Sequence, residues 1–182
     1  MSEEDEKIAR DAASQSLIVA ASKVNESLGS FSGWLVAGVG AAFSLLLANF
    51  ETVTRFICIS NVRNALVLLV IGLVVAVLAR LLAAMVSSAL GSYEAGSTLG
   101  KNLQESGKQL DVNIYISEFE RGLFPYQRWV ARRTMMKVKA GDTVATARMI
   151  AKMSQVQALL VLAETLISII AACFLVAGLK VL

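Results

Sequence analysis

Three long apolar blocks constrain this chain more than any other feature of its sequence. They lie at residues 31–50, 64–90 and 156–182, and the first holds no charged residue. A helix rises about 1.5 Å per residue, so about 20 apolar residues cross the roughly 30 Å hydrocarbon core of a bilayer. Only 17% of the 182 residues are charged, against about a quarter in soluble domains. We therefore predict an all-α integral membrane protein with three transmembrane helices at these blocks.

The polar segments between the blocks complete the predicted organisation. Residues 1–30 form an N-terminal cytoplasmic amphipathic helix in this interpretation, and Gly29 with Ser30 marks its end. Residues 51–63 are an outer loop, and residues 91–155 are a basic, helical cytoplasmic region. The apolar face of the N-terminal helix is predicted from the i, i+3, i+4, i+7 spacing of Leu17, Ala20, Ala21, Val24 and Leu28.

The cytoplasmic region has a few residues that mark helix ends. Pro125 suits the first turn of a helix that runs to about Lys139. Gly141 would end that helix, and Asp142 would cap the next one. Nothing after Asp142 breaks a helix, so we predict one continuous helix of about 40 residues through the third span. Residues 113–117 are predicted to form a short extended piece.

The distribution of Lys and Arg predicts the orientation. Residues 1–30 and 91–155 together hold 13 of these cations, whereas the opposite side has only Arg55, Arg63 and Lys180. Such residues concentrate on the cytoplasmic side of membrane proteins. We therefore expect a multi-pass protein of a bacterial cell inner membrane, with its N-terminus cytoplasmic and its C-terminus outside. The acidic N-terminus does not resemble a cleaved signal peptide.

The sequence offers little for catalysis or metal binding. It has no histidine, which is the commonest general base and metal ligand. Its two cysteines, Cys58 and Cys173, are too few for a cysteine zinc site and too far apart for a disulfide framework. We expect no enzyme activity, no catalytic residue, no cofactor and no metal site.

Two charges lie well inside the predicted spans. Arg80 in the second span and Glu164 in the third are each about five or six residues from the cytoplasmic edge. Because these two helices run antiparallel, both charges reach nearly the same depth. An unpaired charge at the bilayer centre costs about 2.5–3.5 kcal/mol. We predict that the two residues form an intramembrane charge pair, the alternative being that Arg80 snorkels to phosphates while Glu164 is protonated or bonds a hydroxyl.

Small residues at four-residue spacing mark candidate helix-packing surfaces. Such rows let helix backbones approach closely in a membrane. The alternatives are packing within one chain and packing between subunits, and we favour a homo-oligomer because three helices bury little surface. The predicted packing residues are Gly33, Ala37 and Ala41 in the first span, and Ala79, Ala83, Ser87 and Gly91 in the second.

The cytoplasmic region mixes aromatic residues with arginine, a combination that suits the lipid headgroup level. A basic, aromatic surface also fits single-stranded nucleic acid. We expect no nucleic-acid partner, because the membrane orientation already accounts for the positive charge. The predicted lipid-headgroup contacts are Arg121, Arg128, Trp129, Arg132 and Arg133.

These features favour one function and leave a second open. The first is a homo-oligomeric membrane assembly in the lipid bilayer, of which a pore or channel would be one form. Few polar residues in the spans could line a passage, and no ring of charge at mid-membrane supports a channel. The alternative is a scaffold, adaptor or inhibitory subunit of a larger membrane complex, whose protein partner would bind the 91–155 region.

Overall fold

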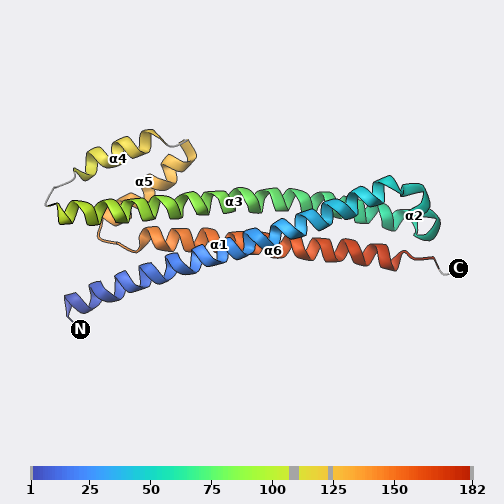
Figure 1. The fold of residues 1–182 in the computed structure, drawn as a ribbon, viewed down its shortest axis with the longest axis horizontal. Coiled ribbons are helices and arrows are strands. Elements are labelled where there is room, and N and C mark those ends of the chain that lie inside the picture. The colour runs from blue at the N-terminus through green and yellow to red at the C-terminus, as the bar shows by residue number, and fades with distance from the viewer. Residues whose placement is uncertain (1, 107–110, 123–124, 181–182) are drawn as a thin grey trace. The chain divides into compact units, whose positions relative to one another are not determined.

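The computed structural model describes residues 2–106, 111–122 and 125–180, and every regular element in that part of the chain is a helix (Figure 1). The single β bridge there joins Ile57 to Leu179. The all-α prediction is therefore confirmed. The helices in chain order are α1 (Glu3–Ala48), α2 (Phe50–Phe56), α3 (Ile59–Glu105), α4 (Val112–Arg121), α5 (Pro125–Lys139) and α6 (Ala145–Ala177).

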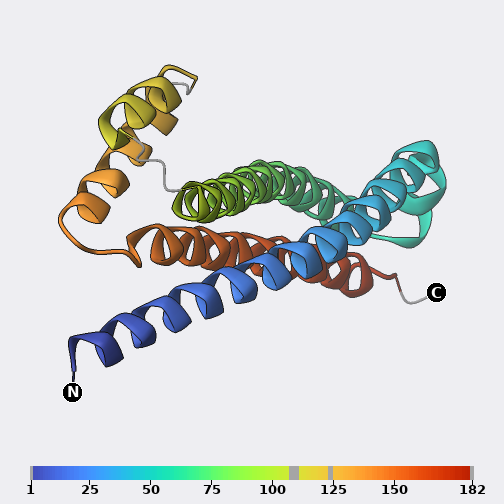
Figure 2. The same cartoon turned by 60° about the vertical axis from the view of Figure 1, so that its left-hand side comes forward.

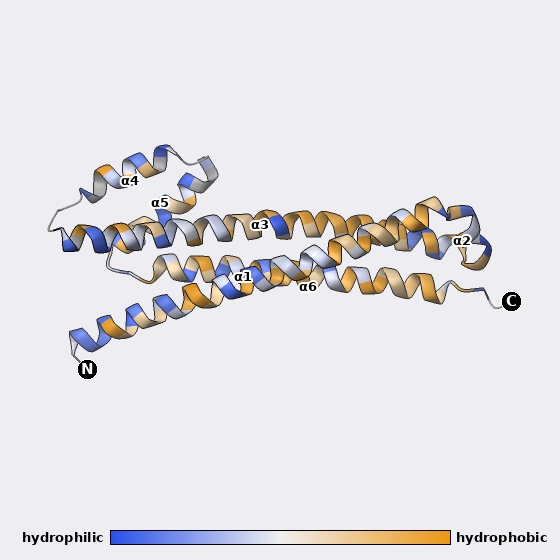
Figure 3. Cartoon of the chain, viewed as in Figure 1, coloured by the Kyte–Doolittle hydropathy of each residue, from blue (hydrophilic) through white to orange (hydrophobic). Residues whose placement is uncertain are grey.

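Three of these helices, α1, α3 and α6, are long and apolar enough to cross a membrane. Hydrophobic residues predominate in the C-terminal halves of α1 and α6 and in the N-terminal half of α3 (Figure 3). These are the regions in which the sequence places its three apolar blocks. The predicted third span extends to residue 182, and residues 181–182 lie outside the described part of the chain.

Helices α1 and α3 are longer than predicted. Helix α1 has 46 residues and continues through Gly29 and Ser30, so the predicted end of the N-terminal helix is wrong. A glycine inside a helix costs only about 1 kcal/mol relative to alanine, which packing on either side easily offsets. Helix α3 has 47 residues and continues to Glu105, so Gly91 and Gly96 lie inside a helix rather than in a polar connection.

Two shorter predicted segments also differ from the structure. The predicted outer loop contains all but the first residue of the seven-residue helix α2, and the first turn of α3. Residues 113–117 belong to α4, so the predicted extended piece is wrong. The rings of Tyr115 and Phe119, four residues apart, stack with centroids 6.2 Å apart, as residues at this spacing on one face of a helix can. A segment of five residues is too short for its pattern to distinguish a strand from one face of a helix.

The connection between α5 and α6 follows the predicted glycine signal. Helix α5 begins at Pro125, and Gly141 has a φ of 94° just after the helix end. The Gly141 N–H donates to the Val138 carbonyl and the Asp142 N–H donates to the Lys137 carbonyl, which is a Schellman motif. Helix α6 has 33 residues, shorter than predicted, because it begins at Ala145 and ends before Gly178.

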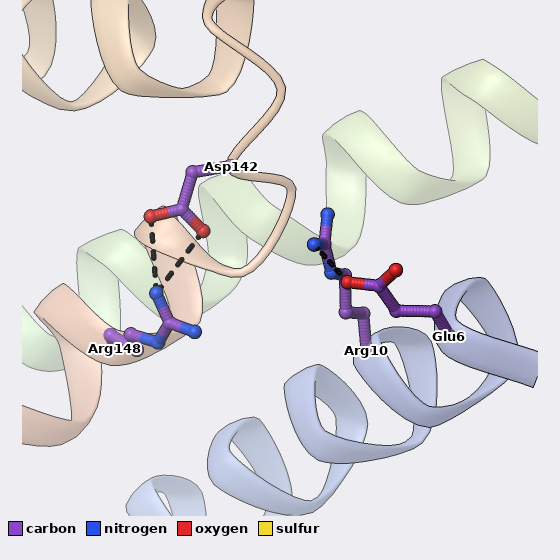
Figure 4. Close-up of polar contacts among 4 residues, drawn as sticks. All are labelled: Glu6, Arg10, Asp142 and Arg148. Carbon is purple, nitrogen blue, oxygen red and sulfur yellow. Dashed lines mark hydrogen bonds and ion pairs between the residues drawn. The ribbon is translucent and has the colours of Figure 1, made fainter. Parts of the chain in front are cut away.

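The expected side-chain cap at Asp142 is replaced by an ion pair. The Asp142 carboxylate accepts hydrogen bonds from Arg148 at 3.1 and 3.2 Å (Figure 4). The same figure shows the ion pair between Glu6 and Arg10 on α1. Both pairs are solvent-accessible, so each contributes at most about 1 kcal/mol.

The chain divides into two compact units, and the first comprises Met1–Ser22 and Val86–Met153. Its core joins the start of α1, the later part of α3 and the start of α6. The Ser14 and Tyr93 hydroxyls lie 3.1 Å apart in a hydrogen bond beside this core. Both views show α4 and α5 as a helical hairpin (Figures 1 and 2). The core residues are Ile18, Ala21, Val86, Leu90, Val144, Ala147 and Ile150.

The buried face of α1 in this unit is rotated from the predicted one. Ser14, Ile18 and Ala21 are buried, whereas Ala20 is exposed. Val24, in the part of α1 that belongs to the second unit, is 40% exposed. The sequence pattern misplaced the face because it counted only apolar residues and therefore passed over Ser14.

The second unit comprises Lys23–Met85 and Ser154–Leu182, and its core is built around Ala65, Leu69 and Ala171. Small residues dominate this core, which allows the backbones of α3 and α6 to approach closely.

The segment from α2 to the start of α3 contacts the C-terminal end of α6 and the residues after it through side-chain hydrogen bonds to backbone carbonyls. The Asn61 Nδ2 donates to the Phe174 carbonyl at 3.0 Å, in addition to the hydrogen bond that this carbonyl accepts from the Gly178 N–H. The Lys180 Nζ donates to the Thr54 carbonyl at 2.8 Å. A Cβ on Gly178 would lie 2.7 Å from the Asn61 Cβ, so only glycine fits there without a shift.

Candidate functional site

The buried positions of the long helices repeat every three and four residues, which is the spacing of coiled-coil seams. In α3 the repeat in the second unit is entirely apolar: Val62, Ala65, Leu69, Gly72, Ala76 and Ala79. In α6 the same spacing includes polar residues, because the buried positions of its second-unit part are Ser154, Gln157, Val161, Glu164 and Ala171. The polar members of this seam are the strongest candidate site.

Glu164 is the charged member of the seam and is 2% exposed. The Ser32 hydroxyl on α1 donates a hydrogen bond to the Glu164 Oε2 at 3.1 Å, and Ser32 is itself buried. A carboxylate at such a position needs donors, because burial without hydrogen bonds is costly. The sequence identified Glu164 but not Ser32 as its partner, although Ser32 is a polar residue inside the first apolar block.

Arg80 lies against the same stretch of α1. A Cβ on Gly33 would lie 2.9 Å from the Arg80 Nη2, so the glycine leaves room for the guanidinium. The Arg80 charge acts electrostatically on the Glu164 carboxyl, while no ion pair within 4.0 Å joins the two groups in the described residues. The structure thus brings both charges to neighbouring residues of α1. Their pairing as a direct contact stays a prediction.

Two further polar residues of the seam were missed by sequence reasoning. Ser154 is 3% exposed and Gln157 is 1% exposed. Within the described chain, the Ser154 Oγ and the Gln157 Oε1 are buried without a hydrogen-bond partner. The signal that could have found them is the seven-residue interval from Gln157 to Glu164. In coiled coils, polar residues at seam positions specify the alignment of the helices at a cost in stability.

The predicted packing residues are distributed between the interior and the surface of the chain. Ala79 is 2% exposed and therefore packs within the chain, and Gly33 faces Arg80. Ala83 is half-buried. The remaining predicted residues, Ala37, Ala41, Ser87 and Gly91, are exposed.

A groove of about 280 Å³ lies on the surface of the second unit, between α1 and α6. Small residues line it at four-residue spacing on both helices: Gly38 and Ala42 on α1, and Ser168 and Ala172 on α6. Trp34, which is 79% exposed, stands at its edge. Gly38 and Ala42 are not among the packing residues predicted from the sequence, because they are offset by about a third of a helical turn from the predicted row that begins at Gly33.

The predicted headgroup residues lie on α4 and α5. Arg121 forms an ion pair with Glu118 at 2.6 Å, so part of its charge is neutralised locally. The guanidinium of Arg133 lies 5.7 Å from the centre of the Trp129 ring, in a cation–π contact. Arg128 and Arg132 are exposed on the same helix.

Metal ligands and cysteines offer no further site. In the residues that the structure describes, no three His, Cys, Asp or Glu side chains gather where they could hold a metal ion. Cys58 and Cys173 are both free and exposed. Hydrogen bonds with Ser60, whose hydroxyl lies 3.3 Å from the sulfur, lower the pKa of the Cys58 thiol.

Comparison with known proteins assigns no family. No family model matches the chain, and neither a curated protein nor a solved structure matches it significantly.

Proposed function

We propose that this chain is a multi-pass membrane protein that associates with copies of itself, with its N-terminus in the cytoplasm and its C-terminus outside. The three long apolar helices support membrane insertion. Large apolar side chains on their outer surfaces, such as Val77, Leu162 and Val176, are more than half exposed. In water this surface would be unfavourable, whereas in a bilayer it meets lipid or another subunit.

The groove between α1 and α6 is the observation that carries the proposal of self-association. It combines two small-xxx-small pairs, one from each helix, on a single open surface. Without a hydrophobic driving force in lipid, helices associate through close van der Waals packing, for which small residues are required. A helix of a second copy fits this description, and the exposed Trp34 at the edge offers it a large contact area.

A matched pair of variants tests this interface. Neither Gly38 nor Gly40 has a neighbouring atom within 4 Å of an added Cβ, so a side chain can begin at either position without a clash inside the single chain. Only Gly38 lies in the groove. We expect Gly38→Leu to raise the dissociation constant of the oligomer at least tenfold, equivalent to about 1.4 kcal/mol, and Gly40→Leu to leave it unchanged. Native mass in detergent measures both.

The other outcomes are equally informative. A wild-type protein that is monomeric contradicts self-association and favours the scaffold or adaptor function. Loss of the oligomer in Gly40→Leu but not in Gly38→Leu would indicate that the interface lies beside the row that contains Ala37 and Ala41. Ion flux in liposomes then separates a channel from an assembly that does not conduct.

A further inference from the structure

Helix α5 concentrates positive charge on a surface that also carries large apolar side chains. Its 15 residues include five Lys or Arg and no acidic residue. Trp129 is 60% exposed and Met136 is 59% exposed. These two residues are seven positions apart and therefore lie on one face of the helix. Arg132 and Arg133 lie between them on the same face.

The opposite side of α5 is held by the rest of its unit. The Thr134 hydroxyl donates to the Val130 carbonyl at 3.0 Å and contacts the Met149 sulfur at 3.1 Å. Thr134 and Val130 are both half-buried. The contact with Met149 of α6 therefore lies on the side of α5 opposite Trp129 and Met136. The face of α5 that carries Trp129 and Met136 is exposed on the surface of the unit.

We propose that this face of α5 binds an anionic lipid surface, with Trp129 and Met136 entering the headgroup boundary and the cations contacting phosphates. A helix with Trp on one face and Lys and Arg beside it is the type that lies in the membrane interface. The Arg133 guanidinium already stacks on Trp129, which holds the ring and a cation together. Helix α5 is also tethered to a bilayer, since five residues join it to α6, a helix apolar enough to span one.

Nucleic acid is the rival partner and fits less well. It would use the charge, but it offers nothing for Met136, whose thioether is an apolar group exposed among cations. A membrane surface satisfies both the charge and the apolar ridge. The proposal does not depend on self-association of the chain, so it survives if that proposal fails.

Fluorescence of Trp129 in the full-length protein provides the test. The variant Trp34→Phe leaves Trp129 as the only tryptophan. The protein is reconstituted into vesicles of phosphatidylcholine alone, or with about 30% phosphatidylglycerol. We expect the anionic vesicles to shift the Trp129 emission to shorter wavelength and to protect it from aqueous iodide. Each cation near an anionic surface contributes about a fivefold gain in binding.

Charge-matched variants separate a specific effect from net charge. Arg132→Gln with Lys137→Gln should weaken the binding of α5 to the anionic surface by about 25-fold. Arg133 is retained so that its contact with the Trp129 ring is unchanged. Lys101→Gln with Lys152→Gln removes the same charge from exposed positions on other helices and should leave the response intact. Equal exposure of Trp129 in both vesicles, or an equal loss in the control, overturns the proposal. Protection by a single-stranded oligonucleotide in neutral vesicles, without protection by anionic lipid, also overturns it.

Discussion

Glu164 is a carboxyl residue that is buried inside the second unit. It is 2% exposed, accepts a hydrogen bond from Ser32 and lies within the electrostatic range of Arg80. We predict that both residues lie within the hydrocarbon region of a bilayer, where neither Arg80 nor Glu164 would have water as an alternative partner. Removing either charge leaves the other without its counter-charge, which costs more than the pair gains by forming.

We therefore expect Arg80→Leu and Glu164→Leu each to lower the stability of the protein, and the double variant to recover part of the loss. The expected coupling is about 0.5–3 kcal/mol, the range for residues that share a network. Thermal unfolding in detergent measures all three variants against the wild type. Strictly additive effects would leave the pairing without support.

A distant cation on the same helix supplies the control for this cycle. Arg63 lies 17 residues before Arg80 on α3, about 25 Å along the helix axis. Arg63→Leu combined with Glu164→Leu should therefore be additive within about 0.5 kcal/mol. Coupling of similar size in both cycles would show a general effect of charge rather than a pair.

At the scale of elements, the turn between α5 and α6 decides how the face of α5 is presented. Its Schellman hydrogen bonds require Gly141 at a φ of 94°, where a side chain is strained. We expect Gly141→Ala to lower the free energy of unfolding by about 1–2 kcal/mol. Thermal unfolding of the purified protein measures the change.

Gly100 provides a control with the opposite sign. It lies inside α3 with no atom within 4 Å of an added Cβ. Gly100→Ala should therefore raise the stability by about 0.5–1 kcal/mol, because alanine favours a helix. Stabilisation by both substitutions would contradict the left-handed conformation of Gly141.

At the scale of the whole molecule, the orientation in the membrane is predicted from the distribution of Lys and Arg, and chemical labelling of the native Cys58 tests this prediction. Cys58 is exposed between α2 and α3, on the side predicted to be outside. In a Cys173→Ser background, we expect a membrane-impermeant maleimide to label Cys58 in intact cells. Because hydrogen bonds from Ser60 lower the pKa of the thiol, the thiolate forms at a lower pH than in an ordinary cysteine. Ser60→Ala should shift the pH profile of labelling upward.

A cysteine at the predicted cytoplasmic end of α3 gives the matching control. Ser106→Cys, in a chain without its two native cysteines, should be labelled only after the cells are permeabilised. Labelling of Ser106→Cys but not of Cys58 in intact cells would reverse the predicted topology.

Features that depend on local chemistry can be predicted from the sequence alone. Three apolar blocks place three helices, Pro125 starts α5, and Gly141 ends it. Each rests on a property of the chain within a few residues, such as hydrophobicity, a fixed φ or the freedom to adopt a positive φ. The prediction that Arg80 and Glu164 lie at similar depth in the membrane also comes from the sequence, by counting residues along the helices.

Which faces of the helices are buried depends instead on packing between segments that are far apart in the chain. Packing hides polar Ser14 and Ser32 on α1 and exposes Ala20 and Val24, so apolar spacing alone predicted only part of the buried face of α1. It also carries α1 through Gly29, because contacts on both sides outweigh a small local cost. Burial is a property of neighbours distant in the chain, so the donor of Glu164 and the groove at Gly38 appear only when α1, α3 and α6 are brought together.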